Sequence, residues 1–427
     1  MMRRDTSIVI CVALTLCACS NKDNPMPSHA DWSAARAKLT FTCAHEADHL
    51  PPLDPQADAF FKYALFLEKK PGPKDYDAAA RYYRIAAAHG HYKANHNLQL
   101  LVSEGLAKSP HAATETIDLV EQLIAAGIPG GYYDMGHYLE LGYGVKKNER
   151  SARVYFRKAA DLGSPEAQYY VGDLLSPKDR APDISRQMME CATNQAYGKA
   201  ASYLGIDLST NKLYSDALKA FQQGVAAGDA QSASFLQYGF DSNPSDAMYY
   251  IGQPKDHERS RRYGLIWEFL DGHESLHPKV PDIDQIVPLP PAKLPPWDGT
   301  FQWQKEQDAA TPPQKPSEAL VAKLAREKNL DPATGFPLTP VKGAKAERVP
   351  LGTTARPGVV CPQDGYWCVQ PFDDYRPEAT RRFSKGETMP QLVMDDPRRI
   401  PGIDALLGMR KHQTDREWTL KAYIEQA

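Results

Sequence analysis

A His-Glu-x-x-His pattern occupies residues 45–49 and matches the motif with which zinc-dependent proteases hold their metal. On a helix, its two imidazoles lie one turn apart and bind zinc, while the glutamate acts as a general base. Prolines follow directly at positions 51 and 52 and would end the helix that such a site needs. No third ligand segment stands out later. We interpret the motif as a polar lead-in to the first helix, and a zinc hydrolase is the less favoured alternative, acting through His45, Glu46 and His49.

Other catalytic patterns are missing from the sequence. There is no Gly-x-Ser-x-Gly nucleophile turn, and no glycine-rich phosphate loop precedes a predicted helix. The formal net charge is −3 and no block of Lys and Arg stands out, which argues against a nucleic-acid-binding surface. We therefore predict a protein that is not an enzyme, with no cofactor and no metal.

The N-terminus is predicted to be an export signal. Two arginines are followed by an apolar run that ends at Cys19 and is too short to span a bilayer. The residues Leu16-Cys17-Ala18-Cys19 resemble the lipobox of bacterial lipoprotein precursors. That resemblance implies cleavage after Ala18 and lipidation of Cys19, with Ser20 favouring the outer membrane. We expect the chain on the periplasmic face of the envelope, held by acyl chains instead of a transmembrane helix.

Export changes how the cysteines are interpreted. Four remain after the lipidated one, namely Cys43, Cys191, Cys361 and Cys368. The periplasm is oxidising, so an even number favours disulfides. Our first choice pairs Cys361 with Cys368, which are close in sequence, and leaves Cys43 with Cys191. The alternative is two or more free buried thiols.

A repeat runs through the first half of the chain. One helical stripe of small and aromatic residues ends in a glycine at 163, and similar windows end at glycines 90, 127 and 228. The first three glycines are 37 and 36 residues apart. Small residues let paired helices approach closely, and a terminal glycine adopts the left-handed conformation that closes a helix. Such units bury their apolar faces by stacking. We predict an all-α fold, an α-solenoid of about five or six helix pairs.

The segment from Tyr138 to Ala152, with its Gly-x-Gly-Val turn, resembles the Sel1-like repeat. We take this resemblance to cover roughly residues 55–250. It implies an adaptor or binding scaffold with a concave face formed mainly by one helix of each pair. Exposed aromatic side chains supply contact area at low entropic cost. Our candidates for partner contact, with packing between repeats as the alternative, are Tyr132, Tyr133, Tyr169 and Tyr170.

The second half differs in composition, with 22 of the 35 prolines lying at or after residue 254. An amphipathic helix is predicted at 261–270, followed by a proline-rich stretch at 281–299. Dense prolines exclude regular helix and favour an extended path, which would cover the exposed end of the solenoid. The stretch from Ile286 to Gly299 resembles a family in which Sel1-like repeats precede this segment. Related lipoproteins resemble the periplasmic immunity partners of type VI secretion phospholipase effectors.

The end of the chain is predicted to be a small β-containing module with aromatic filling, because a turn signal at 363–365 precedes a strand-like run. We expect six segments: a signal peptide at 1–18, a lipidated tether and lead-in at 19–52, an α-solenoid at 53–252, a capping helix and proline-rich segment at 253–300, a linker at 301–350 and the C-terminal module at 351–427.

These observations lead to a functional hypothesis. The favoured function is a periplasmic lipoprotein that binds another protein, a secreted phospholipase effector, and neutralises it by covering its active site or membrane-binding face. The alternative is a Sel1-like scaffold for envelope protein complexes. Neighbouring genes would separate the two, because an adjacent secreted lipase supports immunity.

Overall fold

The computed structural model describes residues 39–338, 349–350, 352–369, 380–396, 410–414 and 416–423. The predicted signal peptide and the predicted lipidation site, Cys19, lie outside the described residues. The chain divides into two compact units, Met1–Thr40 and Phe41–Ala427, and the elements below belong to the second. None of the described helices combines the length and apolar character needed to cross a membrane.

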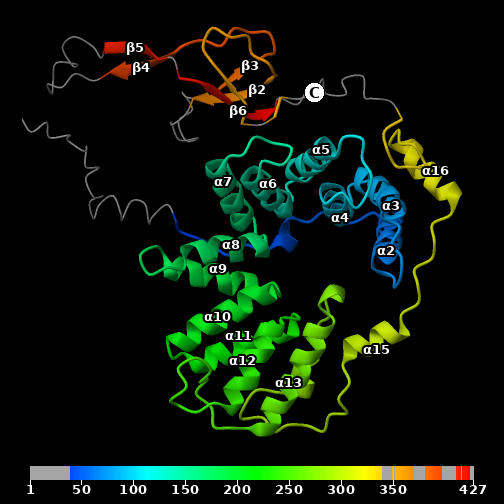
Figure 1. Cartoon of the computed structure of the whole chain (residues 1–427), viewed down its shortest axis with the longest axis vertical. Helices are drawn as coiled ribbons and strands as arrows, with labels where there is room; N and C mark the ends of the chain where they lie inside the picture. The colour runs from blue at the N-terminus through cyan, green and yellow to red at the C-terminus, as the bar shows by residue number, and fades with distance from the viewer. Residues whose placement is uncertain are drawn as a thin grey trace, which may run out of the picture. The chain divides into compact units, whose positions relative to one another are not determined.

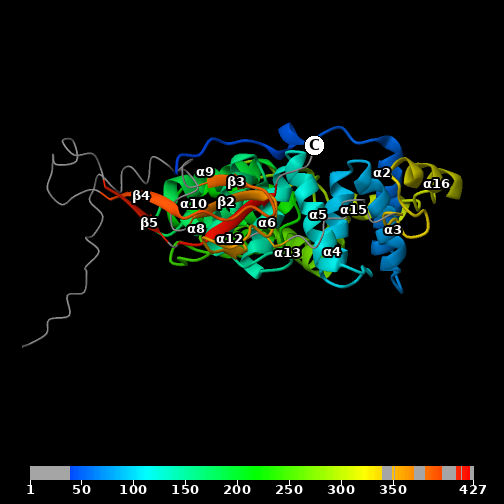
Figure 2. The ribbon, with the colours of Figure 1, turned by 90° about the horizontal axis from the view of Figure 1, so that it is seen from above.

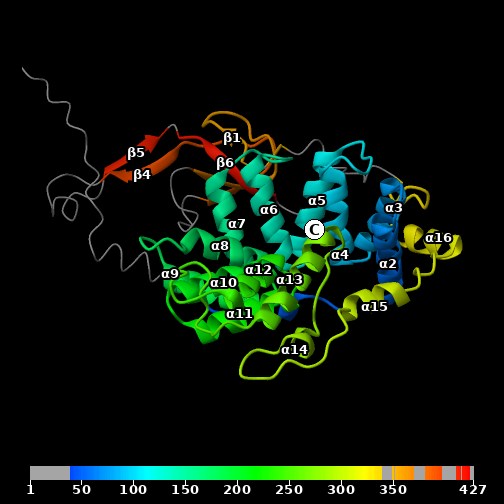
Figure 3. The same cartoon turned by 60° about the horizontal axis from the view of Figure 1, so that its bottom comes forward.

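Twelve consecutive helices form the solenoid, each packed against the helices that precede and follow it (Figures 1 and 3). The helices are α2 (Pro55–Lys69), α3 (Tyr76–Ala88), α4 (Tyr92–Ser103), α5 (Ala112–Ala125), α6 (Pro129–Leu141), α7 (Glu149–Asp161), α8 (Pro165–Leu175), α9 (Pro182–Asn194), α10 (Gly198–Thr210), α11 (Tyr214–Ala226), α12 (Ala230–Asp241) and α13 (His257–Gly272). The tightest pairs join an even-numbered helix to the odd-numbered helix after it. The predicted α-solenoid of about five or six helix pairs is therefore confirmed, with six pairs in the structure.

Local sequence explains where several of these helices start. Asp and Ser side chains accept hydrogen bonds from backbone N–H groups of the first turn: Asp54 caps α2, Ser164 caps α8 and Asp229 caps α12. Prolines stand in the first turn of α2, α6, α8 and α9, where no backbone donor is needed.

Small residues inside the pairs allow the close packing that the repeat predicts. A Cβ added to Gly136 in α6 would lie 2.5 Å from Cε1 of Phe156 in α7. The same relation holds between Gly205 in α10 and Phe221 in α11, also at 2.5 Å. Both phenylalanines are fully buried. Each ring therefore fills the space that a missing side chain leaves on the partner helix.

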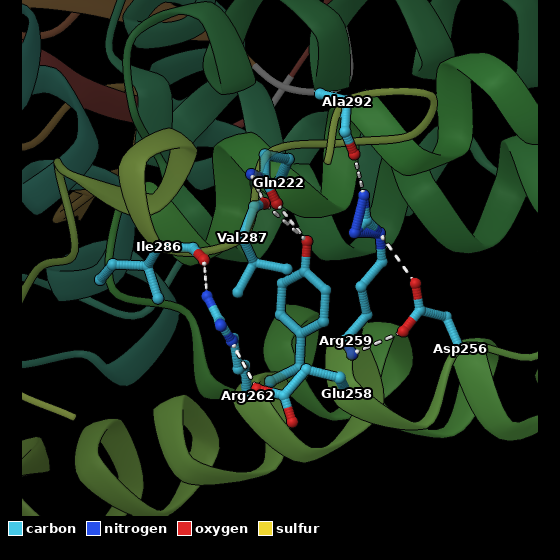
Figure 4. A network of polar contacts seen from close by, with 9 residues as sticks. Gln222, Asp256, Glu258, Arg259, Arg262, Ile286, Val287 and Ala292 are labelled. Carbon is cyan, nitrogen blue, oxygen red and sulfur yellow. Dashed lines mark hydrogen bonds and ion pairs between the residues drawn. The ribbon is translucent and has the colours of Figure 1, made fainter. Parts of the chain in front are cut away.

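A polar network fixes the proline-rich segment on the last helices of the solenoid (Figure 4). The 3-10 turn η2 (Glu274–Leu276) precedes this segment, which contains one short helix, α14 (Ile283–Ile286), where an extended path was predicted. Arg262 of α13 donates to the carbonyl oxygen of Ile286 at 2.7 Å, and Arg259 donates to that of Ala292. Gln222 of α11 donates to the carbonyl oxygen of Val287 at 2.9 Å. In an extended, proline-rich chain many carbonyl oxygens have no backbone N–H donor. These buried side chains supply the missing donors.

The chain then returns to the first helices of the solenoid. It passes through α15 (Gln302–Ala309) to α16 (Glu318–Glu327), which lies beside α3 in Figures 1 and 3. Val321 and Leu324 of α16 are buried in one cluster with apolar residues of α2, α3 and α4. The segment predicted to be a linker thus contains two helices. Each end of the solenoid is covered by a segment from the second half of the chain, as Figure 2 also shows for α16.

The C-terminal module contains a four-stranded antiparallel sheet of order β1-β6-β2-β3, as predicted in kind. Its strands are β1 (Thr354–Ala355), β2 (Gly365–Val369), β3 (Thr380–Phe383) and β6 (Trp418–Tyr423). A separate two-stranded ribbon pairs β4 (Leu392–Asp396) with β5 (Arg410–Thr414). Trp367 of β2 and Trp418 of β6 are fully buried and form the core of the four-stranded sheet.

The predicted bond between Cys361 and Cys368 is wrong, because both thiols are free and buried. Cys361 precedes a turn, and its Sγ contacts the carbonyl oxygen of Gln363 at 3.2 Å. Cys368 is the fourth residue of β2, and three residues of strand carry it about 10 Å from the turn. Closeness in sequence therefore did not bring the two sulfurs together.

Candidate functional site

Residues 41–50, here called the strap, cross the loops that join odd-numbered to even-numbered helices. The strap is the dark-blue segment that passes α8 and leads to α2 in Figures 1 and 2. A disulfide joins Cys43 to Cys191 of α9, with 5.6 Å between the Cα atoms. This is the second of the two bonds expected from the sequence.

Backbone hydrogen bonds hold the strap beside that disulfide. Gln168 of α8 donates from Nε2 to the carbonyl oxygen of Ala44 at 2.9 Å. The backbone N–H of Glu46 donates to Oε1 of Gln195 at 2.8 Å, and Nε2 of Gln195 donates to Oε1 of Gln168 at 2.9 Å. Two glutamines from successive repeats thus bind the strap as a pair. Sequence reasoning missed them, although Gln168 is a fully buried polar residue inside an apolar stripe.

Gly163, which ends the α7 stripe, brings the strap close to the solenoid. Its φ of 102° lies in the left-handed region that other residues resist. A Cβ at this position would lie 2.5 Å from the carbonyl carbon of His45 and 2.6 Å from the backbone nitrogen of Glu46. The repeat glycine therefore ends helix α7 and also leaves room for the strap backbone to pack against the solenoid.

The Glu46 side chain lies among other acids. Burial, and after it the nearby carboxylate of Glu166, raise the pKa of Glu46 to about 7, against a hydrogen bond from the Gly130 backbone that lowers it. The carboxyl group is thus partly protonated near neutral pH.

A histidine–aspartate pair lies near this carboxyl group. Nδ1 of His96 in α4 lies 3.0 Å from Oδ2 of Asp134 in α6. Burial alone lowers the pKa of His96, but the carboxylates of Asp134 and its neighbours outweigh burial and raise it. The even-numbered helices therefore present a titratable, acid-rich cluster to the strap.

The His-Glu-x-x-His motif does not form a protease helix. It lies in η1 (Glu46–His49), a single 3-10 turn, and His45 precedes that turn in an extended conformation. The two histidines therefore do not share one face of an α-helix, as the motif requires. In the part of the chain that the structure describes, one group of potential metal ligands has its ligand atoms within 4.8 Å of one another, and it contains Cys43, His45 and Cys191 but not His49.

The four tyrosines predicted for partner contact are all half-buried. The ring centroid of Tyr170 lies 4.3 Å from that of Phe156, and that of Tyr133 lies 5.7 Å from it. Tyr169 packs with Tyr197 of the next repeat, with 5.6 Å between centroids, and Tyr132 with Tyr155 at 6.2 Å. Tyr169 and Tyr170 thus pack against neighbouring repeats, whereas Tyr132 and Tyr133 pack on α7 within their own helix pair. Contact of these four rings with a partner stays a prediction.

Two family models match the chain. The Sel1 repeat matches residues 61–91 and 129–164, and a domain of unknown function (DUF6396) matches residues 232–338. The second match spans α12, α13, the proline-rich segment and α16. No curated protein matches the sequence.

Three solved structures from Pseudomonas aeruginosa resemble the chain. PA5086 is 30% identical and covers 59% of this chain, which covers 95% of PA5086, with a TM-score of 0.47. The immunity protein PA5087 has the same identity and coverages and a TM-score of 0.48. The immunity protein PA5088 is 28% identical, with coverages of 59% and 94% and a TM-score of 0.49.

All three TM-scores lie below 0.5, so the relationship rests on sequence identity and not on superposition. Two of these proteins are 30% identical to the chain over 95% of their length. Together with two matches to the repeat model, this identity places the chain in the family of Sel1-repeat proteins.

Proposed function

We propose that this chain is an immunity protein that binds and neutralises a toxic lipase-type effector delivered by type VI secretion. One observation carries the proposal: two proteins described as immunity proteins are 28% and 30% identical to it over 94% and 95% of their length. The sequence similarity to periplasmic immunity partners of phospholipase effectors supports the choice of a lipase as the target.

Neutralisation would proceed by occlusion and needs no chemistry from this chain. A solenoid presents a long surface built from successive repeats, which suits it to cover the active site or membrane-binding face of another protein. The half-buried tyrosines, including Tyr169 and Tyr170, would add contact area with little loss of side-chain freedom. Exposed acidic residues of the solenoid would attract a basic patch on the effector and speed its association.

The expected location is the periplasmic face of the outer membrane, with the lipid on Cys19. Between Cys19 and the strap, the chain has 21 residues and can span at most about 70 Å when fully extended. The solenoid would therefore act close to the membrane, where a lipase reaches its substrate.

Co-expression tests the proposal directly. A lipase from the same locus is directed to the periplasm, and survival is compared with and without this chain. We expect protection and a complex that co-purifies. If the chain gives no protection and forms no complex with the lipase, the proposal is wrong. Association with a different envelope assembly would favour the scaffold alternative.

A Cys19→Ser variant separates binding from anchoring. It should move from the membrane fraction to the soluble periplasm and still bind the purified lipase. If it stays in the membrane fraction, the predicted anchor is wrong, whatever the outcome of the protection assay.

A further inference from the structure

We propose that the strap carries a metal site, which forms when the Cys43–Cys191 disulfide is reduced and takes Zn²⁺ through two cysteine thiolates and one imidazole. The ligands are Cys43 and His45 of the strap and Cys191 of α9. The potential ligand atoms of these three residues all lie within 4.8 Å of one another. In a tetrahedral zinc site, sulfur and nitrogen ligands lie about 3.5–3.8 Å apart, so only a small movement separates the two arrangements.

Backbone conformation explains why two strap residues face the same cysteine. His45 has φ −111° and ψ 138°, which is extended chain. In extended chain, side chains two residues apart point to the same side. Cys43 and His45 therefore both face α9, where Cys191 is 2% exposed.

The strap stays in place without the disulfide because other contacts position it. The hydrogen bonds from Gln168 to Ala44 and from Glu46 to Gln195 flank the three ligands and do not depend on the state of the sulfurs. Sγ of Cys191 also lies 3.4 Å from the carbonyl oxygen of Ala44. A reduced strap thus retains a preorganised ligand set, which lowers the entropic cost of binding a metal.

The donor chemistry favours zinc. Thiolates and imidazole are the ligands of structural and catalytic zinc sites, and three protein ligands leave the fourth position to water. Cys43 and His45 are exposed, so water reaches that position. A metal bridge would close the same loop as the disulfide, which links residues 148 positions apart. The strap would then be cross-linked in both oxidation states.

The chemical steps balance. A water-soluble trialkylphosphine gives two electrons to the disulfide, takes oxygen from one water molecule to become the phosphine oxide, and leaves two thiols that hold the two protons of that water. Zn²⁺ then displaces both protons to form two zinc–thiolate bonds. Zinc binding should therefore release protons and weaken as the pH falls.

The experiment uses the full chain in detergent, carrying Cys361→Ser and Cys368→Ser so that other thiols of the described fold do not bind metal. Zinc is added before and after reduction with the phosphine, and bound metal is counted by native mass spectrometry and by competition with a chromophoric chelator. We expect one additional zinc ion per chain after reduction. Equal binding by the oxidised and reduced proteins would overturn the proposal.

Two histidine variants locate the site. Because His45 is exposed, His45→Ala should fold normally and bind zinc at least tenfold more weakly after reduction. His49→Ala is the matched control and should bind as the parent does. If His49→Ala loses zinc and His45→Ala does not, the proposed ligand set is wrong. If both lose zinc and the oxidised protein binds it too, the His-Glu-x-x-His motif is the site.

Two further measurements separate ligation from a structural effect. Co²⁺ in place of Zn²⁺ should give a thiolate charge-transfer absorption band, which His45→Ala would shift and His49→Ala would not. Exchange of the Glu46 amide should slow when zinc is added to the reduced protein. An unchanged exchange rate would mean that the metal does not hold the strap.

Discussion

At the scale of single residues, Glu46 makes the seat of the strap sensitive to pH. Its pKa rises from 4.5 to about 7 on folding, because burial and Glu166 disfavour its charge. Between these values the unfolded chain has lost the proton and the folded chain has kept it. The free energy of unfolding therefore falls as pH rises from about 4.5 to 7, and the loss stays constant above that.

Glu46→Gln should remove this loss. We expect the variant to be more stable than the parent at pH 8, by on the order of 1 kcal/mol once partial exposure is allowed for, and to differ little at pH 5. Urea unfolding at the two pH values measures this difference. His96→Gln is a useful comparison because its raised pKa also makes stability fall with pH. A Glu46→Gln variant equally destabilised at both pH values would contradict the argument.

Gly163 offers a second test at this scale. Gly163→Ala combines an unfavourable φ with a Cβ 2.5 Å from the strap backbone, whereas Gly90→Ala has a similar φ of 79° and nothing within 4 Å. The control should cost about 1 kcal/mol of unfolding free energy, and Gly163→Ala about 2–4 kcal/mol. Denaturant unfolding gives both values. Equal costs would mean that the strap yields without strain.

The sequence predicts some of these residues and not others, for a physical reason. Gly163 was found because it ends a periodic helical stripe. The partners of the strap were not found, because its bonds to Gln168 and Gln195 join residues 124 and 149 positions apart. No local pattern encodes such separations. For Cys361 and Cys368, nearness in sequence favoured a bond that the direction of β2 prevents.

At the scale of elements, the contact between α13 and the proline-rich segment rests on buried donors. Arg262 is 7% exposed and bonds both Glu258 and the carbonyl oxygen of Ile286. Arg262→Met would leave that carbonyl without its donor and should cost about 1–3 kcal/mol. Arg261→Met is the control, because Arg261 is exposed and bonds only Glu258 among the hydrogen-bond partners described for it.

Thermal unfolding distinguishes the two variants. Arg261→Met should stay within about 0.5 kcal/mol of the parent. If both variants lose the same stability, the charge on α13 matters more than the bond to the proline-rich segment. The sequence indicates that this segment covers the solenoid, because prolines and apolar residues alternate there. It does not indicate which arginine or glutamine meets which carbonyl.

At the scale of the whole molecule, α16 belongs to the first helices although it lies far along the sequence. Leu324 is 3% exposed in the cluster with α2 to α4. Leu324→Ala should cost about 2–4 kcal/mol locally and speed amide exchange in α2 and α3. Helices α10 to α13 should exchange as in the parent, because solenoid contacts link mainly neighbours.

Arg326→Ala, two residues later and exposed, is the control and should leave exchange unchanged, because the hydrogen bond described for its side chain goes to Ala322 of the same helix. Faster exchange throughout the chain in Leu324→Ala would contradict a local effect. The sequence indicates one possible helix, at residues 316–328, inside the segment predicted to be a linker. It does not predict the contact with α3, because the apolar face of an amphipathic helix does not specify which helix it packs against.

The ion pair between Arg81 and Glu318 joins positions 237 residues apart. Ribosomes add about 5–20 residues each second, so the first repeats wait on the order of tens of seconds for the helix that completes their apolar cover. During that interval the apolar cluster of α2, α3 and α4 lacks Val321, Leu324 and Ala325, which are buried in it in the complete chain. Under the proposed export, such a delay would help keep the nascent chain unfolded for passage through a translocation pore, and the early repeats would be the part that a chaperone must protect.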